Sequence, residues 1–232
     1  MGLNKEAIKI GFAYVGIVVG AGFSTGQEVM QFFTGFGLWS YIGVILSGLI
    51  LGFIGRQVAK IGTAFDAQNH ESTLEYLFGK GLNKFIDYVL IFFLFGISVT
   101  MIAGAGSTFE ESYGIPTWLG ALIMIIAIYV TLLMDFNKIV RALGFVTPFL
   151  IILVVIIAIF YLFNGSIPLN KVNETVPNAS LWKGILYGIN YGGLAFAVGF
   201  STIVAIGGDA SKRSVSGRGA LFGGIVYTVL LA

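Results

Sequence analysis

The residues in this sequence that could do chemistry gather around a glycine-rich apolar run near the N-terminus. The run holds four glycines within eleven residues, interspersed with or followed by polar side chains: Gly16, Gly20, Gly22, Ser24, Thr25, Gly26 and Glu28. Each glycine inside a helix costs about 1 kcal/mol relative to alanine, so the run is expected to unwind and to bind a small polar solute. The glycines are also spaced four apart in two pairs, as in a close helix-packing seam. A packing seam explains the glycines but does not explain the carboxylate of Glu28.

A second glycine-rich apolar run lies near the other end of the chain. It combines four glycines with one amide side chain: Gly188, Asn190, Gly192, Gly193 and Gly199. The tetrapeptide Gly-Phe-Ser-Thr occurs at 22–25 and again at 199–202. We therefore expect a second break over 193–199, at which the carbonyls of Leu194 and Ala197 accept an amine and Phe196 covers the bound solute.

The elements that must position these residues are membrane helices. The chain of 232 residues is 57% hydrophobic and only 10% charged, against about 25% charged in an ordinary soluble domain. A bilayer core of about 30 Å needs about 20 apolar residues per helix. The stretches that meet or approach this length number seven: 7–33, 38–58, 85–108, 117–134, 140–163, 181–207 and 219–232. The sequence thus predicts an all-α integral membrane protein whose partner is the lipid bilayer.

The distribution of positive charge predicts the orientation of these helices. With the N-terminus inside, all thirteen lysine and arginine residues except Lys171 and Lys183 fall in inside segments. Because lysine and arginine concentrate on the cytoplasmic side, we expect a multi-pass protein of the cell membrane with a cytoplasmic N-terminus.

Composition also excludes several functional classes. The chain has no cysteine and a single histidine, His70, so it offers no Cys-ligated or histidine-cluster metal site, and its net charge of +2 does not suggest nucleic-acid binding. The segment 22–26 fits the Gly-x-Ser-x-Gly pattern of hydrolases, but that motif needs a strand-turn-helix setting and a histidine base. We therefore expect no enzyme activity and no cofactor other than a coupling ion, Na⁺ or H⁺.

Paired broken helices in two inverted halves are the sequence pointer to a secondary transporter. We expect a permease for a small organic solute, an amino acid or a related amine. Glu28 has no lysine or arginine in its own segment after Lys9, so it is expected to carry a proton or to recognise a cationic group. A membrane sensor or structural protein that transports nothing is the alternative, and the sequence leaves the oligomeric state open.

A family resemblance adds to this interpretation. Val19-Gly-Ala-Gly22 followed by Phe-Ser-Thr-Gly-Gln-Glu28 resembles the first helix of the YkvI-type bacterial permeases of the amino acid–polyamine–organocation superfamily. The resemblance covers the whole chain and implies a LeuT-like fold of two inverted five-helix repeats, with substrate at the breaks of helices one and six. The first repeat would be 1–163, and 164–232 would hold an outer loop, helix six and part of helix seven. From Gly219 to Ala232 a helix spans only about 20 Å, so we expect a truncated chain.

The same resemblance assigns backbone groups to ligands. It implies that the amides of Ala21 and Gly22 bind a substrate carboxylate. It further implies that the carbonyls of Gly16 and Val19 supply two oxygen ligands of a sodium ion.

Overall fold

The computed structural model describes residues 4–19, 26–164 and 180–232, and within these ranges the chain is helical with no strand. The elements follow one another as α1 (Lys5–Val18), α3 (Gln27–Phe32), the 3-10 segment η1 (Thr34–Trp39), α4 (Ser40–Leu49), the π-helical segment η2 (Ile50–Ile54), α5 (Gly55–Ala64), α6 (Glu71–Tyr113), α7 (Thr117–Leu132), α8 (Phe136–Asn164), α9 (Leu181–Gly208) and α10 (Arg213–Leu231).

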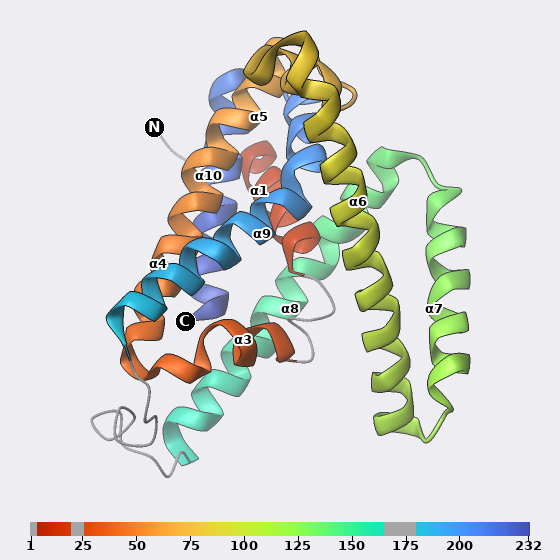
Figure 1. Ribbon diagram of the computed structural model, residues 1–232, viewed down its shortest axis with the longest axis vertical. Helices are drawn as coiled ribbons and strands as arrows, with labels where there is room; N and C mark the ends of the chain where they lie inside the picture. Colours follow the sequence, from red (N-terminus) through yellow and green to blue (C-terminus); the bar gives the residue numbers. More distant parts are fainter. Residues whose placement is uncertain (1–3, 20–25, 165–179) are drawn as a thin grey trace.

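The first apolar stretch is interrupted, as predicted. The side chain of Asn4 caps α1 by accepting the backbone N–H of Ala7 at 2.8 Å. The helix ends at Val18, and Val19 is extended, with φ −81° and ψ 91°. The next described helix, α3, begins at Gln27 after Gly26, which is in the left-handed conformation. Figure 1 shows α3 lying crosswise below the lower end of α1.

The third apolar stretch begins earlier than predicted. The polar run 62–84 was expected to separate two helices, but α6 already starts at Glu71 and continues to Tyr113. Its path bends sharply at Gly79, whose φ of 74° and ψ of 169° are not helical. Residues 71–78 therefore form a separate helical arm in front of the long apolar part of α6.

The predicted break in the sixth apolar stretch is wrong. The helix α9 runs without interruption through 193–199, so the carbonyls of Leu194 and Ala197 lie inside a continuous helix. Its glycines instead allow close packing against α4 and α5. A Cβ atom built at Gly192 would lie 2.8 Å from the Cα of Ser47, and one at Gly184 would lie 2.6 Å from the carbonyl oxygen of Trp39. The packing seam, and not an unwound segment, explains this run.

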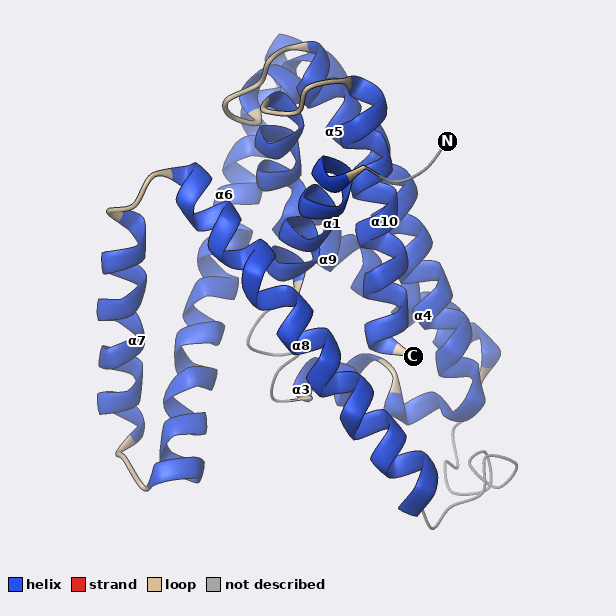
Figure 2. Ribbon diagram, turned by 180° about the vertical axis from the view of Figure 1, so that it is seen from behind, coloured by secondary structure: helices blue, strands red, loops and turns tan. Residues whose placement is uncertain are grey.

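The core lies where α1, α4, α5, α9 and α10 meet (Figures 1 and 2). Tyr14 of α1 is completely buried at its centre. Three helices make room for its ring with glycines, because a Cβ at Gly55, Gly199 or Gly223 would lie 2.7, 2.8 or 3.1 Å from the nearest ring or hydroxyl atom of Tyr14. Helices on both sides of the predicted boundary at residue 164 thus share one core.

The helices α6, α7 and α8 flank this core, with α8 packed on α1, and they present large apolar side chains on their outer faces. Phe92 of α6 is 79% exposed and Phe163 of α8 is 85% exposed. Among the described residues, five helical stretches are long and apolar enough to cross a membrane: 34–64, 71–113, 136–160, 181–208 and 213–231. The helix α7 has 16 residues and is shorter than these. Seven stretches were predicted, and five of this length are found among the described residues. The all-helical membrane architecture is thus confirmed. The LeuT-like inverted repeat and the division at 163 stay predictions.

Candidate functional site

The candidate site begins at Gly26, where the chain re-enters a helix after the interruption. Gly26 has a φ of 72°, and a Cβ atom there would meet no other atom within 4 Å. Glycine is favoured at this position by the left-handed backbone and not by crowding, since this conformation costs other residues about 1–2 kcal/mol. This turn places Glu28 in the first turn of α3.

The carboxylate of Glu28 meets a tyrosine from the other end of the chain. The hydroxyl of Tyr191, on α9, donates a hydrogen bond of 2.7 Å to Oε2 of Glu28. Tyr191 is 1% exposed, whereas Glu28 is half-buried. No lysine or arginine within the described ranges forms an ion pair with Glu28. The carboxylate is therefore oriented by a neutral donor and has no cationic partner among the described residues.

Aromatic rings surround this hydrogen bond. The ring of Phe32 lies 4.9 Å from that of Tyr191, and the ring of Phe33 packs edge-on against Tyr191 at 5.1 Å. On the far side, Tyr227 of α10 stacks on Tyr191 at 6.2 Å. The Tyr227 hydroxyl is buried and makes no hydrogen bond of ordinary geometry to the described residues. The rings of Tyr191, Phe33 and Tyr227 are themselves buried, so the half-buried carboxylate of Glu28 is the group that an organic cation would meet.

The other residues predicted for helix one are only partly placed. Gly20, Ala21, Gly22 and Ser24 lie outside the described residues. Gly16 lies in the last turn of α1, where it packs against Thr147 of α8, and Val19 follows that turn. Carbonyl groups at the end of a helix lack intrahelical donors, which suits them as oxygen ligands, and the sodium role of Gly16 and Val19 stays a prediction.

The residues predicted for helix six lie on a different face of α9 from Tyr191. Gly193, Leu194 and Ala197 line a groove of about 550 Å³ between α9 and α6, and neither Glu28 nor Tyr191 lines it. Among the described residues that line this groove, Asn190 has the only polar side chain. The ring of Phe196 packs edge-on against Phe200 at 5.8 Å. The structure thus does not bring these residues together with Glu28, and their part in substrate binding stays a prediction.

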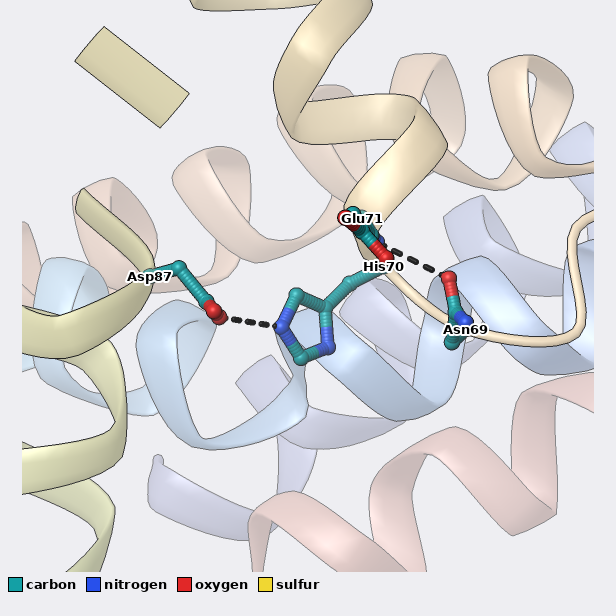
Figure 3. Close-up of polar contacts among 4 residues, drawn as sticks. All are labelled: Asn69, His70, Glu71 and Asp87. Carbon is teal, nitrogen blue, oxygen red and sulfur yellow. Dashed lines mark hydrogen bonds and ion pairs between the residues drawn. The ribbon is translucent and has the colours of Figure 1, made fainter. Parts of the chain in front are cut away.

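A second polar contact is one that the sequence did not indicate. Nε2 of His70 and Oδ1 of Asp87 lie 2.7 Å apart (Figure 3). The residues are 17 positions apart in what is nearly one helix, and the bend at Gly79 brings them together. Asp135 pairs with Lys138 at 3.1 Å, in the connection between α7 and α8.

Sequence reasoning missed Tyr191, the partner of Glu28. The tyrosine is part of the glycine-rich run Tyr187-Gly-Ile-Asn-Tyr191, but its contact spans 163 positions. The feature of the sequence that could have indicated Tyr191 is a hydroxyl-bearing aromatic residue among the glycines of a membrane helix. No group of three or more histidine, cysteine, aspartate or glutamate side chains within the described ranges could hold a metal ion.

Comparison with known proteins identifies two relatives. The chain is 31% identical over 228 residues to a protein of Bacillus subtilis (strain 168) described as "Uncharacterized membrane protein YkvI", over 98% of this chain and 65% of that protein. It is 32% identical over 149 residues to "Uncharacterized protein YyaD" of the same organism, over 64% of this chain and 43% of that protein. The chain therefore spans less than two thirds of the length of either relative.

No family model matches the chain, and no solved structure matches it. The long apolar helices and the similarity to YkvI over 98% of this chain nevertheless both indicate a membrane protein. This chain is a homologue of a bacterial membrane protein and is itself a multi-pass membrane protein.

Proposed function

We propose that this chain belongs to a secondary transporter for a small amine-bearing organic solute, such as an amino acid, which binds beside the interruption between α1 and α3. The observation that carries the proposal is the half-buried carboxylate of Glu28, fixed by Tyr191 and without a described ion-pair partner. Placing a carboxylate inside a membrane protein costs free energy, so such a residue usually has a functional role.

The position of Glu28 favours an amine over a carboxylate as the recognised group. A negative side chain in the first turn of a helix is stabilised by the free N–H groups there, and Glu28 occupies that place in α3. A substrate carboxylate at the same turn would face a like charge. The amine of an amino acid would instead complete an ion pair with Glu28.

Ligand-dependent stability is the first test. Purified protein in detergent would be heated with amino acids, amines and nucleobases in turn, each with and without sodium. We expect amine-bearing solutes to raise the melting temperature, and a dependence on sodium would favour Na⁺ over H⁺ as the coupling ion. Uptake of the stabilising solute into proteoliposomes then separates a transporter from a sensor, because a sensor would be stabilised without accumulating the solute.

The substitution Glu28→Gln tests the carboxylate itself. It keeps the size of the side chain and its capacity to accept from Tyr191, but removes the charge. Losing a charge-assisted interaction of about 1.5–3 kcal/mol should weaken binding of amine-bearing solutes by about 10- to 100-fold. If Glu28 instead carries the coupling proton, the variant should still exchange solute but lose the pH dependence of accumulation. Wild-type affinity together with wild-type pH dependence would show that Glu28 has neither role.

A further inference from the structure

A second cavity lies between α5 and α10, away from Glu28. Its volume is about 790 Å³. Four cationic side chains line it, two from each helix: Arg56, Lys60, Arg213 and Arg218. Figure 1 shows α5 and α10 side by side near one end of the molecule. We call this space the basic cavity.

The two helices are held together closely beneath the basic cavity. A Cβ atom at Gly217 of α10 would lie 2.7 Å from Cε of Lys60 and 3.4 Å from Cγ of Arg56. The aliphatic stems of these two side chains therefore lie against the backbone of α10. With the stems packed in this way, the charged groups lose less freedom when they bind an anion.

A buried hydroxyl pair fixes the first turn of α10 in this arrangement. Oγ1 of Thr63 and Oγ of Ser216 lie 2.7 Å apart, and Ser216 is completely buried. Oγ of Ser216 also lies 3.2 Å from the carbonyl oxygen of Arg213, and Oγ1 of Thr63 lies 2.7 Å from the carbonyl oxygen of Gly207. Each hydroxyl has one proton to donate, so the two protons are shared among these three contacts. The backbone that carries Arg213 is thus tied to α5 and to the end of α9.

Within the described lining of the basic cavity, every charged side chain is positive. Among the described residues that line it, none is an aspartate or a glutamate. No described carboxylate forms an ion pair with Arg56, Lys60 or Arg213. Like charges gathered in one concave site repel each other, and a bound anion relieves that repulsion.

The rim of the basic cavity is aromatic. The rings of Phe65 and Tyr76 lie 5.3 Å apart, and they are 47% and 65% exposed. Phe65 follows the last residue of the candidate membrane-spanning stretch 34–64, and Arg213 is the first residue of the stretch 213–231. The cavity therefore lies at the ends of two spanning segments, at the level where aromatic and basic side chains meet lipid headgroups.

We propose that the basic cavity binds a phosphate-bearing anion. Guanidinium groups pair with phosphate oxygens in a bidentate way and lysine adds a point charge, so the lining fits this chemistry. The phosphate can belong to the headgroup of an anionic lipid, as in basic pockets between membrane helices, or to a free ion. The site is independent of the solute bound at Glu28.

Thermal unfolding in phosphate-free detergent buffer tests this site. The wild-type protein would be titrated with phosphatidylglycerol, phosphatidylcholine or inorganic phosphate. The double variant Lys60→Gln/Arg213→Gln removes one charge from each helix, and Lys84→Gln/Lys183→Gln removes two exposed charges that do not line the cavity. At about 1 kcal/mol per charge, the cavity variant should bind about 10- to 30-fold more weakly, and the control should bind as the wild type does.

The titration arms also separate the two sources of the phosphate. Stabilisation by phosphatidylglycerol but not by phosphatidylcholine or inorganic phosphate identifies a lipid headgroup, and stabilisation by inorganic phosphate identifies a free ion. The variant Lys60→Arg/Arg213→Lys keeps the charges and should keep the binding, and a melting temperature of the glutamine variant without ligand equal to that of the wild type shows that its loss of binding is not misfolding. Equal responses of the glutamine variant and the control, or no response of the wild type to either anion, would overturn the proposal.

Discussion

Tyr191 and Glu28 form the contact on which the proposed solute site depends. The bond joins an element near the N-terminus to α9 and lies among the rings of Phe32, Phe33 and Tyr227. It has two consequences at the residue scale. It orients the carboxylate, and it supplies one of the few side-chain links between α3 and the helix behind it.

The substitution Tyr191→Phe should therefore cost stability as well as affinity. It keeps the ring contacts but removes the only described hydrogen-bond donor to Glu28. A hydrogen bond to a charged group contributes about 1.5–3 kcal/mol, and we expect the free energy of unfolding in mixed micelles to fall by up to this amount. Tyr187→Phe is the matched control, because the Tyr187 ring packs on Phe32 and Phe36 without a described hydroxyl bond. Equal losses in both variants would mean that the hydroxyl of Tyr191 adds nothing.

Gly26 offers a second test at the residue scale. Gly26→Ala meets no steric obstacle, but alanine disfavours a φ of 72°, so the variant should lose about 1–2 kcal/mol. Gly35→Ala is the control, since that glycine also has open space around it and no left-handed backbone. The difference in unfolding free energy between the two variants measures the strain, and no difference would contradict the left-handed turn before α3.

At the scale of the elements, α9 is organised by its glycines as a packing surface. The face with Gly184, Gly188 and Gly192 lies against α4, while Gly193 on the next face has nothing within 4 Å of a Cβ. Small residues four apart let membrane helices approach closely. Close packing of α9 therefore requires some of its glycines, such as Gly188, but not Gly193.

The variants Gly188→Ala and Gly193→Ala should separate these two kinds. A Cβ at Gly188 would overlap the backbone of Gly43, and overpacking of this kind costs about 1–3 kcal/mol. A Cβ at Gly193 meets no atom, and alanine favours a helix over glycine by about 1 kcal/mol. We expect the first variant to unfold at lower denaturant concentration than the wild type and the second at equal or higher concentration. The reverse order would contradict the packing of Gly188 against Gly43.

The α6 arm shows a second way in which an element is shaped. Gly79 turns the helix through a positive φ, and His70 then reaches Asp87 (Figure 3). The same arm carries Tyr76 to the rim of the basic cavity. The bend at Gly79 thus sets the direction of the arm that brings Tyr76 to that cavity.

At the scale of the whole molecule, the directions of the helices agree with the predicted alternation. The connections α5–α6, α7–α8 and α9–α10 lie toward the upper end in Figure 1, and α6–α7 lies at the lower end. The first three were predicted to be cytoplasmic from their lysine and arginine content. The structure contains no membrane, so the side that faces the cytoplasm is a prediction.

Cysteine labelling can test this orientation, because the chain has no cysteine of its own. In intact cells, a membrane-impermeant thiol reagent should label Glu111→Cys, next to the α6–α7 connection, and should label Met134→Cys, in the α7–α8 connection, only after permeabilisation. Both positions are exposed. The opposite pattern would place the N-terminus outside, and the basic cavity with it would face away from the cytoplasm.

The sequence by itself determined the features that depend on local composition. Apolar length gave the membrane class and the approximate extent of the helices, and the cluster of glycines before Glu28 gave the interruption between α1 and α3. These features follow from the cost of glycine in a helix and of polar backbone in a bilayer, which are properties of neighbouring residues.

Only the tertiary structure decided what the glycines of α9 do and which partner Glu28 has. A helix with several glycines either unwinds or packs closely, and the outcome depends on the surface it meets, here α4 and the ring of Tyr14. Likewise Tyr191 contacts Glu28, and Arg56 joins Arg213, only because α9 and α10 fold back between helices from the first part of the chain. Such contacts join residues more than a hundred positions apart, and no local pattern encodes them.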